Sequence, residues 1–157
     1  MKLYRISFLL LLLLSITSLA LAKPVISSDS SYLDVNTGRY VLEGHVRVET
    51  GSRIITADKA QVSIASLEVW GQGHITLTQE DIHFTGNSVY VNGSDKEATI
   101  EGGTDFERTG LSITSDSAKF NWETKIADFY DNVTVRRGDE TSTANHISYH
   151  VIDDAIL

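Results

Sequence analysis

The sequence contains no cysteine, which excludes disulfides, thiolate metal sites, a cysteine nucleophile and a lipid-modified N-terminal cysteine. Proline occurs once, at Pro24, so breaks in the structure must come from glycine, asparagine, aspartate and serine. Basic residues are also few, and 13 of them against 21 acidic ones give a net charge of −8. A chain this acidic is a poor candidate for binding nucleic acid or an anionic membrane surface through charge alone.

The one long apolar run lies at the N-terminus. Two basic residues precede the run Phe8–Leu14, and the segment ends in Ala20-Leu21-Ala22. A positive start, a short apolar centre and a small-x-small exit predict a secretory signal that is cleaved after Ala22. An uncleaved membrane anchor is the alternative. We therefore expect a signal peptide over residues 1–22, one domain over residues 23–157, and a protein that acts outside the cytoplasm.

A repeat of 29 residues organises the rest of the chain. A threonine followed two positions later by Asp or Asn recurs at this interval, and a glycine column keeps the same step. Four copies in unbroken register predict stacked supersecondary units that bury a continuous core only together. The first column is Thr56-Ala57-Asp58, Thr85-Gly86-Asn87, Thr114-Ser115-Asp116 and Thr143-Ala144-Asn145, and the second is Gly44, Gly73 and Gly102, with Asp131 in fourth place.

Within each unit the hydrophobic period is two, which is typical of strands with one apolar face. Leu42, Val46 and Val48 share one parity, while Glu43 and Arg47 lie on the other. No window after residue 23 supports an amphipathic helix. The sequence therefore predicts an all-β protein of about 10–14 short strands. Two facing sheets in a flattened sandwich, or alternatively a flattened coil, would close over the apolar face.

The two polar columns have different predicted roles. An Asx side chain can hydrogen-bond the backbone two residues on, so we expect Asp58 and its equivalents to cap their own turns. A glycine in mid-strand, such as Gly44 or Gly73, marks a bulge, a corner or the close approach of another backbone.

The sequence offers no catalytic constellation. The common nucleophile, zinc-protease and phosphate-loop motifs are all missing from the sequence. His45 and His74 occupy one repeat column, but Gly103 and Asn132 follow them and break any metal ladder. We therefore expect no enzyme activity, no metal site and no cofactor.

An apolar stripe runs through all the repeats, and from spacing alone it has two interpretations. It is either the dry core of a β-protein or the lining of a groove that holds lipid chains. The candidate groove residues are Leu42, Val46, Val48, Ile55, Val62, Ile64, Ile75, Leu77, Phe84, Val91, Ile100, Phe106, Ile113, Phe120, Trp122, Phe129, Val133, Val135 and Tyr149.

Two segments resemble the signature of the OstA-like, or LptA-type, lipopolysaccharide-transport family. The first runs from Leu42-Glu43-Gly44-His45-Val46-Arg47-Val48-Glu49 into Ile54-Ile55-Thr56-Ala57-Asp58-Lys59-Ala60-Gln61-Val62. The second, at the end of the chain, is Tyr130-Asp131-Asn132-Val133-Thr134-Val135 followed by Thr143-Ala144-Asn145-His146-Ile147-Ser148-Tyr149. The resemblance implies a β-jellyroll of two facing sheets without catalytic residues. It also implies a periplasmic carrier that accepts lipopolysaccharide from the inner-membrane side and passes it toward an outer-membrane translocon.

The same resemblance implies end-to-end association with related jellyroll domains, or with further copies of the chain. We expect the strand His146–Val151 to be the docking edge, because an unpaired edge can pair with a neighbour. Arg136 and Arg137 form the only adjacent basic pair in the predicted mature chain, and we expect them in a solvated turn, with the lipid phosphates outside the groove. The alternatives are a structural β-solenoid or surface-assembly protein with a dry core, and a membrane-anchored member of the same transport fold.

Overall fold

The computed structural model describes residues 23–157, and the predicted signal peptide (residues 1–22) lies outside this part. The described chain forms one antiparallel sheet of eleven strands, in which each long strand pairs with its neighbours in sequence. No helix occurs in residues 23–157, and so none there could span a membrane. The strands are β1 (Val25–Ser27), β2 (Ser30–Asp34), β3 (Arg39–Thr50), β4 (Arg53–Ser63), β5 (Glu68–Gln79), β6 (Ile82–Asn92), β7 (Glu97–Arg108), β8 (Leu111–Asn121), β9 (Ile126–Arg137), β10 (Glu140–His150) and β11 (Ala155–Ile156).

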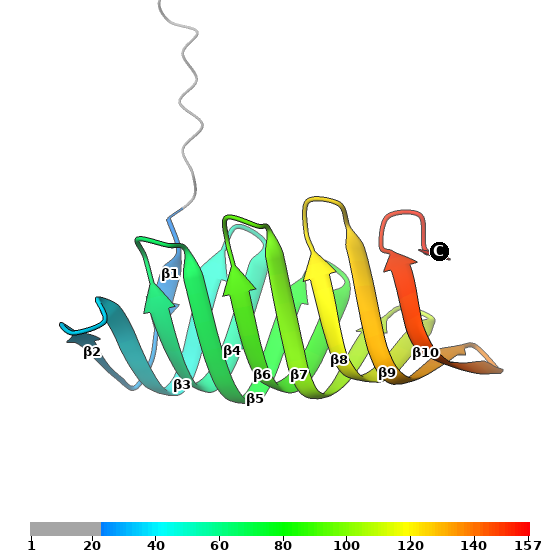
Figure 1. Cartoon of the computed structure of the whole chain (residues 1–157), viewed down its shortest axis with the longest axis horizontal. Coiled ribbons are helices and arrows are strands. Elements are labelled where there is room, and N and C mark those ends of the chain that lie inside the picture. The colour runs from blue at the N-terminus through cyan, green and yellow to red at the C-terminus, as the bar shows by residue number, and fades with distance from the viewer. Residues whose placement is uncertain (1–22) are drawn as a thin grey trace, which may run out of the picture.

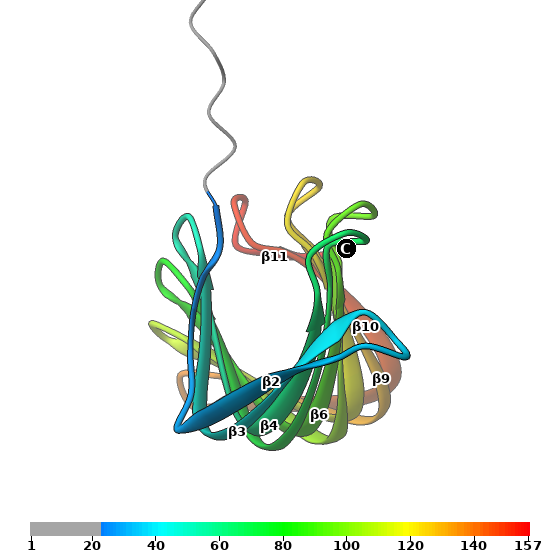
Figure 2. The same cartoon turned by 90° about the vertical axis from the view of Figure 1, so that its left-hand side faces the viewer.

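The all-β prediction is confirmed, but the strands are longer than expected. β3 to β10 each have 11 or 12 residues. The odd-numbered ones begin at Arg39, Glu68, Glu97 and Ile126, one 29-residue step apart, so each repeat is a pair of strands (Figure 1). The expected two facing sheets are the two walls of a single sheet, because every long strand bends near its middle (Figure 2). We call the resulting shape the trough.

The bend is produced by a bulge that recurs in every repeat. In β3, Gly44 and His45 have φ values of +74° and +45°, and the pairing with β4 shifts register at this point. Two consecutive residues in the left-handed region turn the strand sharply, which is a conformation that glycine adopts without steric cost. The pairs Gly73–His74, Gly102–Gly103 and Asp131–Asn132 repeat this geometry. The mid-strand glycine column therefore marks corners, as one of the sequence-based interpretations proposed.

The prediction that the Asx column caps its own turns is wrong. Asp58 lies inside β4, at the corner, and its carboxylate oxygen Oδ2 is 2.7 Å from Nδ1 of His74 on β5. Asp116 accepts a hydrogen bond from Asn132 Nδ2 in the equivalent place. The register shift puts Asp58, Asn87 and Asp116 opposite the bulge of the following strand. The partners of Asp58 and Asp116 are therefore cross-strand residues sixteen positions away.

The two ends of the sheet differ. At the N-terminal end, β2 pairs with β3 and leaves the apolar side chains of Tyr32, Leu33 and Val35 exposed. At the C-terminal end, β11 pairs with Tyr149 and His150 of β10. The predicted docking edge His146–Val151 is therefore covered at Tyr149 and His150, and its role in docking stays a prediction. Residues 140–148 of β10 have no β11 partner, and the side chains of residues 140–146, which we call the free half of β10, are all exposed.

Candidate functional site

The inner face of the trough is a continuous apolar interior. Two halves of each bent strand contribute to it, so side chains from the two walls meet one another across the trough. Five aromatic rings form its centre, with centroids 4.8 Å apart for Phe84–Phe106 and 5.5 Å for Phe106–Phe129. Phe106 also contacts Tyr149, at 5.6 Å, and Phe84 contacts Phe120 at the same distance. All five side chains are 0% exposed.

Most of the predicted groove residues lie in this interior. Seventeen of the nineteen are buried, and they form one hydrophobic cluster. Trp122 is partly buried, and its side chain packs against the cluster. Ile64 is the exception, because β4 ends at Ser63 and leaves Ile64 in a hairpin turn, 46% exposed. In the sequence, the alternation of apolar and polar residues continues one residue beyond the end of the strand, so it included Ile64.

Several interior residues were missed because they are small. Ala98, Ala118 and Ala127 are 0% exposed, and each is paired in register with a phenylalanine on a neighbouring strand. Phe120 lies between Ala98 and Ala127, which gives its ring the room that a larger neighbour would take. The repeat could have identified all three, since Ala98 and Ala127 follow Val69, and Ala118 follows Val89, at steps of 29 residues.

The interior is closed by its own side chains. The largest residues are fully buried, and among residues 23–157 no buried side-chain nitrogen or oxygen lacks a hydrogen-bond partner. Gln79, Thr104 and Ser115 are the polar residues buried in this part of the chain. An acyl chain would therefore enter a space that is already packed, and the walls would have to separate to admit it.

Polar residues close the C-terminal part of the mouth of the trough. Arg108 donates hydrogen bonds to the hydroxyl of Tyr149 (2.8 Å) and to the carbonyl oxygen of Val151 (2.6 Å). Asp154 accepts a hydrogen bond from the same hydroxyl and two from Arg137, at 3.0 and 2.9 Å. The bonds from Arg137, and then the one from Tyr149, lower the pKa of Asp154 to about 2.

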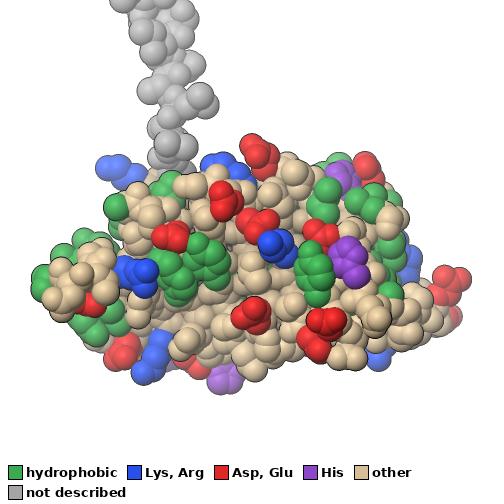
Figure 3. All heavy atoms as spheres, viewed as in Figure 1, with side chains coloured by type: hydrophobic (Ala, Val, Ile, Leu, Met, Phe, Trp, Pro, Cys, Tyr) green, Lys and Arg blue, Asp and Glu red, His purple; other side chains and the backbone are tan. Residues whose placement is uncertain are grey.

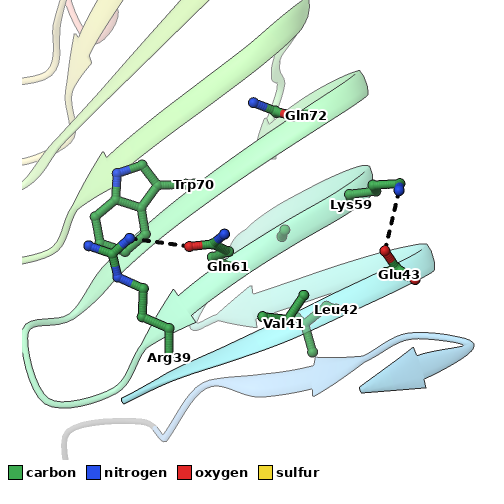
Figure 4. Close-up of a pocket in the computed structure, with 9 residues that line it drawn as sticks. Arg39, Val41, Leu42, Glu43, Lys59, Gln61, Trp70 and Gln72 are labelled. Carbon is green, nitrogen blue, oxygen red and sulfur yellow. Dashed lines mark hydrogen bonds and ion pairs between the residues drawn. The ribbon is translucent and has the colours of Figure 1, made fainter. Parts of the chain in front are cut away.

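The outer wall carries a shallow pocket that is lined mainly by polar and charged residues (Figure 4). The guanidinium of Arg39 lies 3.8 Å from the ring centroid of Trp70 and donates to Oε1 of Gln61 at 3.2 Å. Nearby, Lys59 and Glu43 form an ion pair of 3.3 Å. Around this pocket the outer wall is a mixture of charged, polar and scattered apolar side chains (Figure 3). The charged groups of this pocket have partners, and the face shown in Figure 3 has no continuous apolar surface for a lipid chain.

The structure gives no support for a metal centre at the histidine column. His45 and His74 are each exposed and hydrogen-bonded through Nδ1 to a different aspartate, Asp29 and Asp58, both at 2.7 Å. The hydrogen bond to Asp29, followed by its charge, raises the pKa of His45. Within residues 23–157, no group of three or more potential metal-ligating side chains lies together.

Arg136 and Arg137 do not form a joint basic site. Arg137 forms an ion pair with Asp154, while Arg136 is exposed on β9.

The only histidine stacked on an aromatic ring within the described residues is His146, whose ring centroid is 4.8 Å from that of Tyr130 on the outer wall.

Comparison with known proteins agrees with this architecture. A family model described as LptA/(LptD N-terminal domain) LPS transport protein matches residues 25–154. Among solved structures, the fold is similar to that of LptH, the LptA homologous periplasmic component of the lipopolysaccharide transport device from Pseudomonas aeruginosa. That match has a TM-score of 0.65 and 14% identity, and covers 78% of this chain and 94% of LptH. No curated protein matches the sequence. Because the family model spans nearly the whole described region, the chain belongs to the LptA/LptD N-terminal domain family of lipopolysaccharide transport proteins.

Proposed function

We propose that this protein is a non-enzymatic periplasmic carrier that shields the acyl chains of lipopolysaccharide between the inner and the outer membrane. The observation that carries the proposal is the interior of the trough, where seventeen predicted groove residues form one apolar cluster between two walls. Membership of a lipopolysaccharide-transport family supports lipopolysaccharide as the lipid. The sugars and phosphates would remain outside the trough, in water.

The energetics favour such a role. Exposing acyl chains to water costs about 0.8 kcal/mol for each methylene, so a chain of about a dozen carbons costs on the order of 10 kcal/mol. Contact with the inner faces of both walls would remove most of this cost. No nucleotide-binding motif occurs in the sequence, so the energy for directional transport would come from other components.

Transport across a compartment also requires neighbours. The proposed partners are related jellyroll domains of inner-membrane and outer-membrane transport components, or further copies of this chain. The exposed apolar side chains beside β2 and the free half of β10 lie at opposite ends of the sheet (Figure 1). Backbone pairing between such ends would extend one trough into the next.

The second candidate is a structural protein whose interior is only a core. The complete burial of Phe84, Phe106 and Phe129 favours this second candidate, because the interior of the described structure is packed by its own side chains. A third candidate, a membrane-anchored form of the same carrier, differs only in residues 1–22. Sequencing the N-terminus of the exported protein tests it: a mature chain that starts at Lys23 excludes the anchor.

Photo-cross-linking in cells separates the carrier from the structural protein. A photoreactive amino acid at Phe106 reports on the interior, and the same probe at Glu107 reports on the exposed outer face. We expect a lipopolysaccharide adduct at Phe106 and none at Glu107. If a folded variant with the probe at Phe106 forms no lipid adduct, the interior is a dry core and the carrier function is wrong.

A further inference from the structure

The mouth of the trough is bordered by two rows of hairpins (Figure 2). Because the strands alternate in direction, the turns after the odd-numbered strands form one row and those after the even-numbered strands form the other. We call these rows the first rim and the second rim. The line along which the two rims face each other is called the seam. The first rim has its turns at residues 51–52, 80–81, 109–110 and 138–139, and the second at 64–67, 93–96, 122–125 and 151–154.

One contact across the seam joins Arg53 to Trp122. Arg53 begins β4 on the first rim, and Trp122 follows the end of β8 on the second rim, 69 positions later. The guanidinium carbon lies 3.7 Å from the ring centroid, and Nε donates to Oε1 of Gln79 at 3.2 Å. Within the described chain Arg53 forms no ion pair with a carboxylate. Its burial is therefore balanced by the ring and one amide alone.

A second set of contacts crosses the seam nearer the C-terminus. Arg108, on the first rim, is bonded to Tyr149 and Val151, which lie at the second rim, and forms an ion pair of 2.7 Å with Asp81. Arg137 adds its two bonds to Asp154. Arg108 and Arg137 each donate several charge-assisted hydrogen bonds. The contacts of Arg108 and Arg137 across the seam are therefore much stronger than the contact between Arg53 and Trp122.

Building on the carrier function proposed above, we propose that the seam opens at Arg53 and Trp122 to admit acyl chains, while the crossing at Arg108 and Arg137 stays closed. Arg53 would then be a latch that holds the packed, lipid-free state. Breaking the contact releases both groups into water, where the guanidinium is fully hydrated. Opening the other crossing would leave the hydroxyl of the buried Tyr149 without its partners, which is costly.

The first test is the rate at which the purified protein takes up fluorescently labelled lipopolysaccharide from micelles. Replacing Arg53→Gln removes the latch, and we expect uptake to become several-fold faster. Arg39→Gln is the matched control, because Arg39 covers Trp70 and contacts Gln61 in the same way, but on the outer wall and away from the seam. It should leave the rate unchanged. Urea unfolding of each variant establishes that it is folded.

Two other outcomes overturn the latch. An unchanged rate for Arg53→Gln means that the contact does not limit opening. A slower rate, seen with bisphosphorylated but not with dephosphorylated lipid A as the probe, means that Arg53 instead binds the anionic head group. If the unaltered protein takes up no lipid at all, the carrier function itself fails.

The second test locks the seam without changing the latch. The natural chain has no cysteine, so Ser52→Cys with Glu123→Cys creates one thiol on each rim, next to Arg53 and Trp122. A short bismaleimide that joins them should block uptake. The control pair, Ser52→Cys with Glu80→Cys, joins two hairpins of the same rim and should leave uptake intact. If the protein locked across the seam still loads at the normal rate, lipid enters at the ends of the trough and the latch is wrong.

Discussion

Asp58 and His74 meet at the bottom of the trough, where Oδ2 of the aspartate lies 2.7 Å from Nδ1 of the histidine on the next strand. Contacts with the same spacing of sixteen residues join Asp29, between β1 and β2, to His45, and Asp116 to Asn132. Each pair covers a bulge whose backbone has two left-handed residues in succession. The polar columns of the repeat therefore build the corners that give the sheet its two walls.

The corner between β6 and β7 allows a direct test of this arrangement. A Cβ atom added at Gly102 would lie 2.6 Å from Cβ of Asn87, whereas one added at Gly103 would have no atom within 4 Å. Both residues have φ above +80°, so both alanine variants carry the left-handed strain of roughly 1–2 kcal/mol. We expect Gly102→Ala to lower the free energy of unfolding, measured in urea, by clearly more than Gly103→Ala. Equal losses would mean that the close approach of Asn87 is unimportant.

The aromatic centre should contribute strongly to stability. Phe106 is fully buried against Phe84, Phe129 and Tyr149. Phe106→Ala should lower the free energy of unfolding by about 3–5 kcal/mol, since it removes ring contacts and leaves a cavity. Its neighbour Glu107 is exposed, so Glu107→Ala should change stability by less than about 0.5 kcal/mol. Denaturant unfolding measures both, and a small loss for Phe106→Ala would indicate a loosely packed interior.

The closure near the C-terminus should be sensitive to acid. Because the pKa of Asp154 is lowered from 3.8 to about 2, its carboxylate stabilises the fold above about pH 4 and loses this effect as the pH falls through about 2. Asp154→Asn removes that dependence while keeping a residue that tolerates the positive φ of +51°. Urea midpoints measured between about pH 5 and pH 2 should fall less for the variant than for the natural chain. Parallel curves would contradict the assignment.

The free half of β10 should control end-to-end association. Thr141 and Thr143 are exposed there, and lysine at a sheet edge opposes pairing with another strand. The double variant Thr141→Lys, Thr143→Lys should abolish association in sedimentation experiments without a change in melting temperature. Thr109→Lys, on an exposed hairpin, is the control for the added charge. Association that survives the double variant would place the contact elsewhere.

These point variants are preferable to deleting residues 143–157. That deletion would remove Tyr149, which is fully buried in the aromatic centre, together with β11. A truncated chain would lose part of its core, so a loss of association could not be assigned to the edge.

The sequence by itself determined the strands, their 29-residue repeat and most of the interior. Period-two alternation is a local property, and repetition makes it visible: Val48, Leu77, Phe106 and Val135 occupy one column and are all buried. The small residues Ala98 and Ala127 were not predicted as interior residues, because alanine contributes little to a hydrophobic pattern, although their position in the repeat is regular.

Only the tertiary structure decided how the two walls arise and where they meet. Paired left-handed residues bend β3, β5, β7 and β9 through their middles, and the even-numbered strands are paired with them on both sides of the bend. The result is one sheet with two facing walls, in which Asp58 lies next to His74. The contact between Arg53 and Trp122 spans 69 positions and depends on the summed curvature of five strands. No local pattern encodes such a distance, because side chains at the rims meet only after every corner between them has formed.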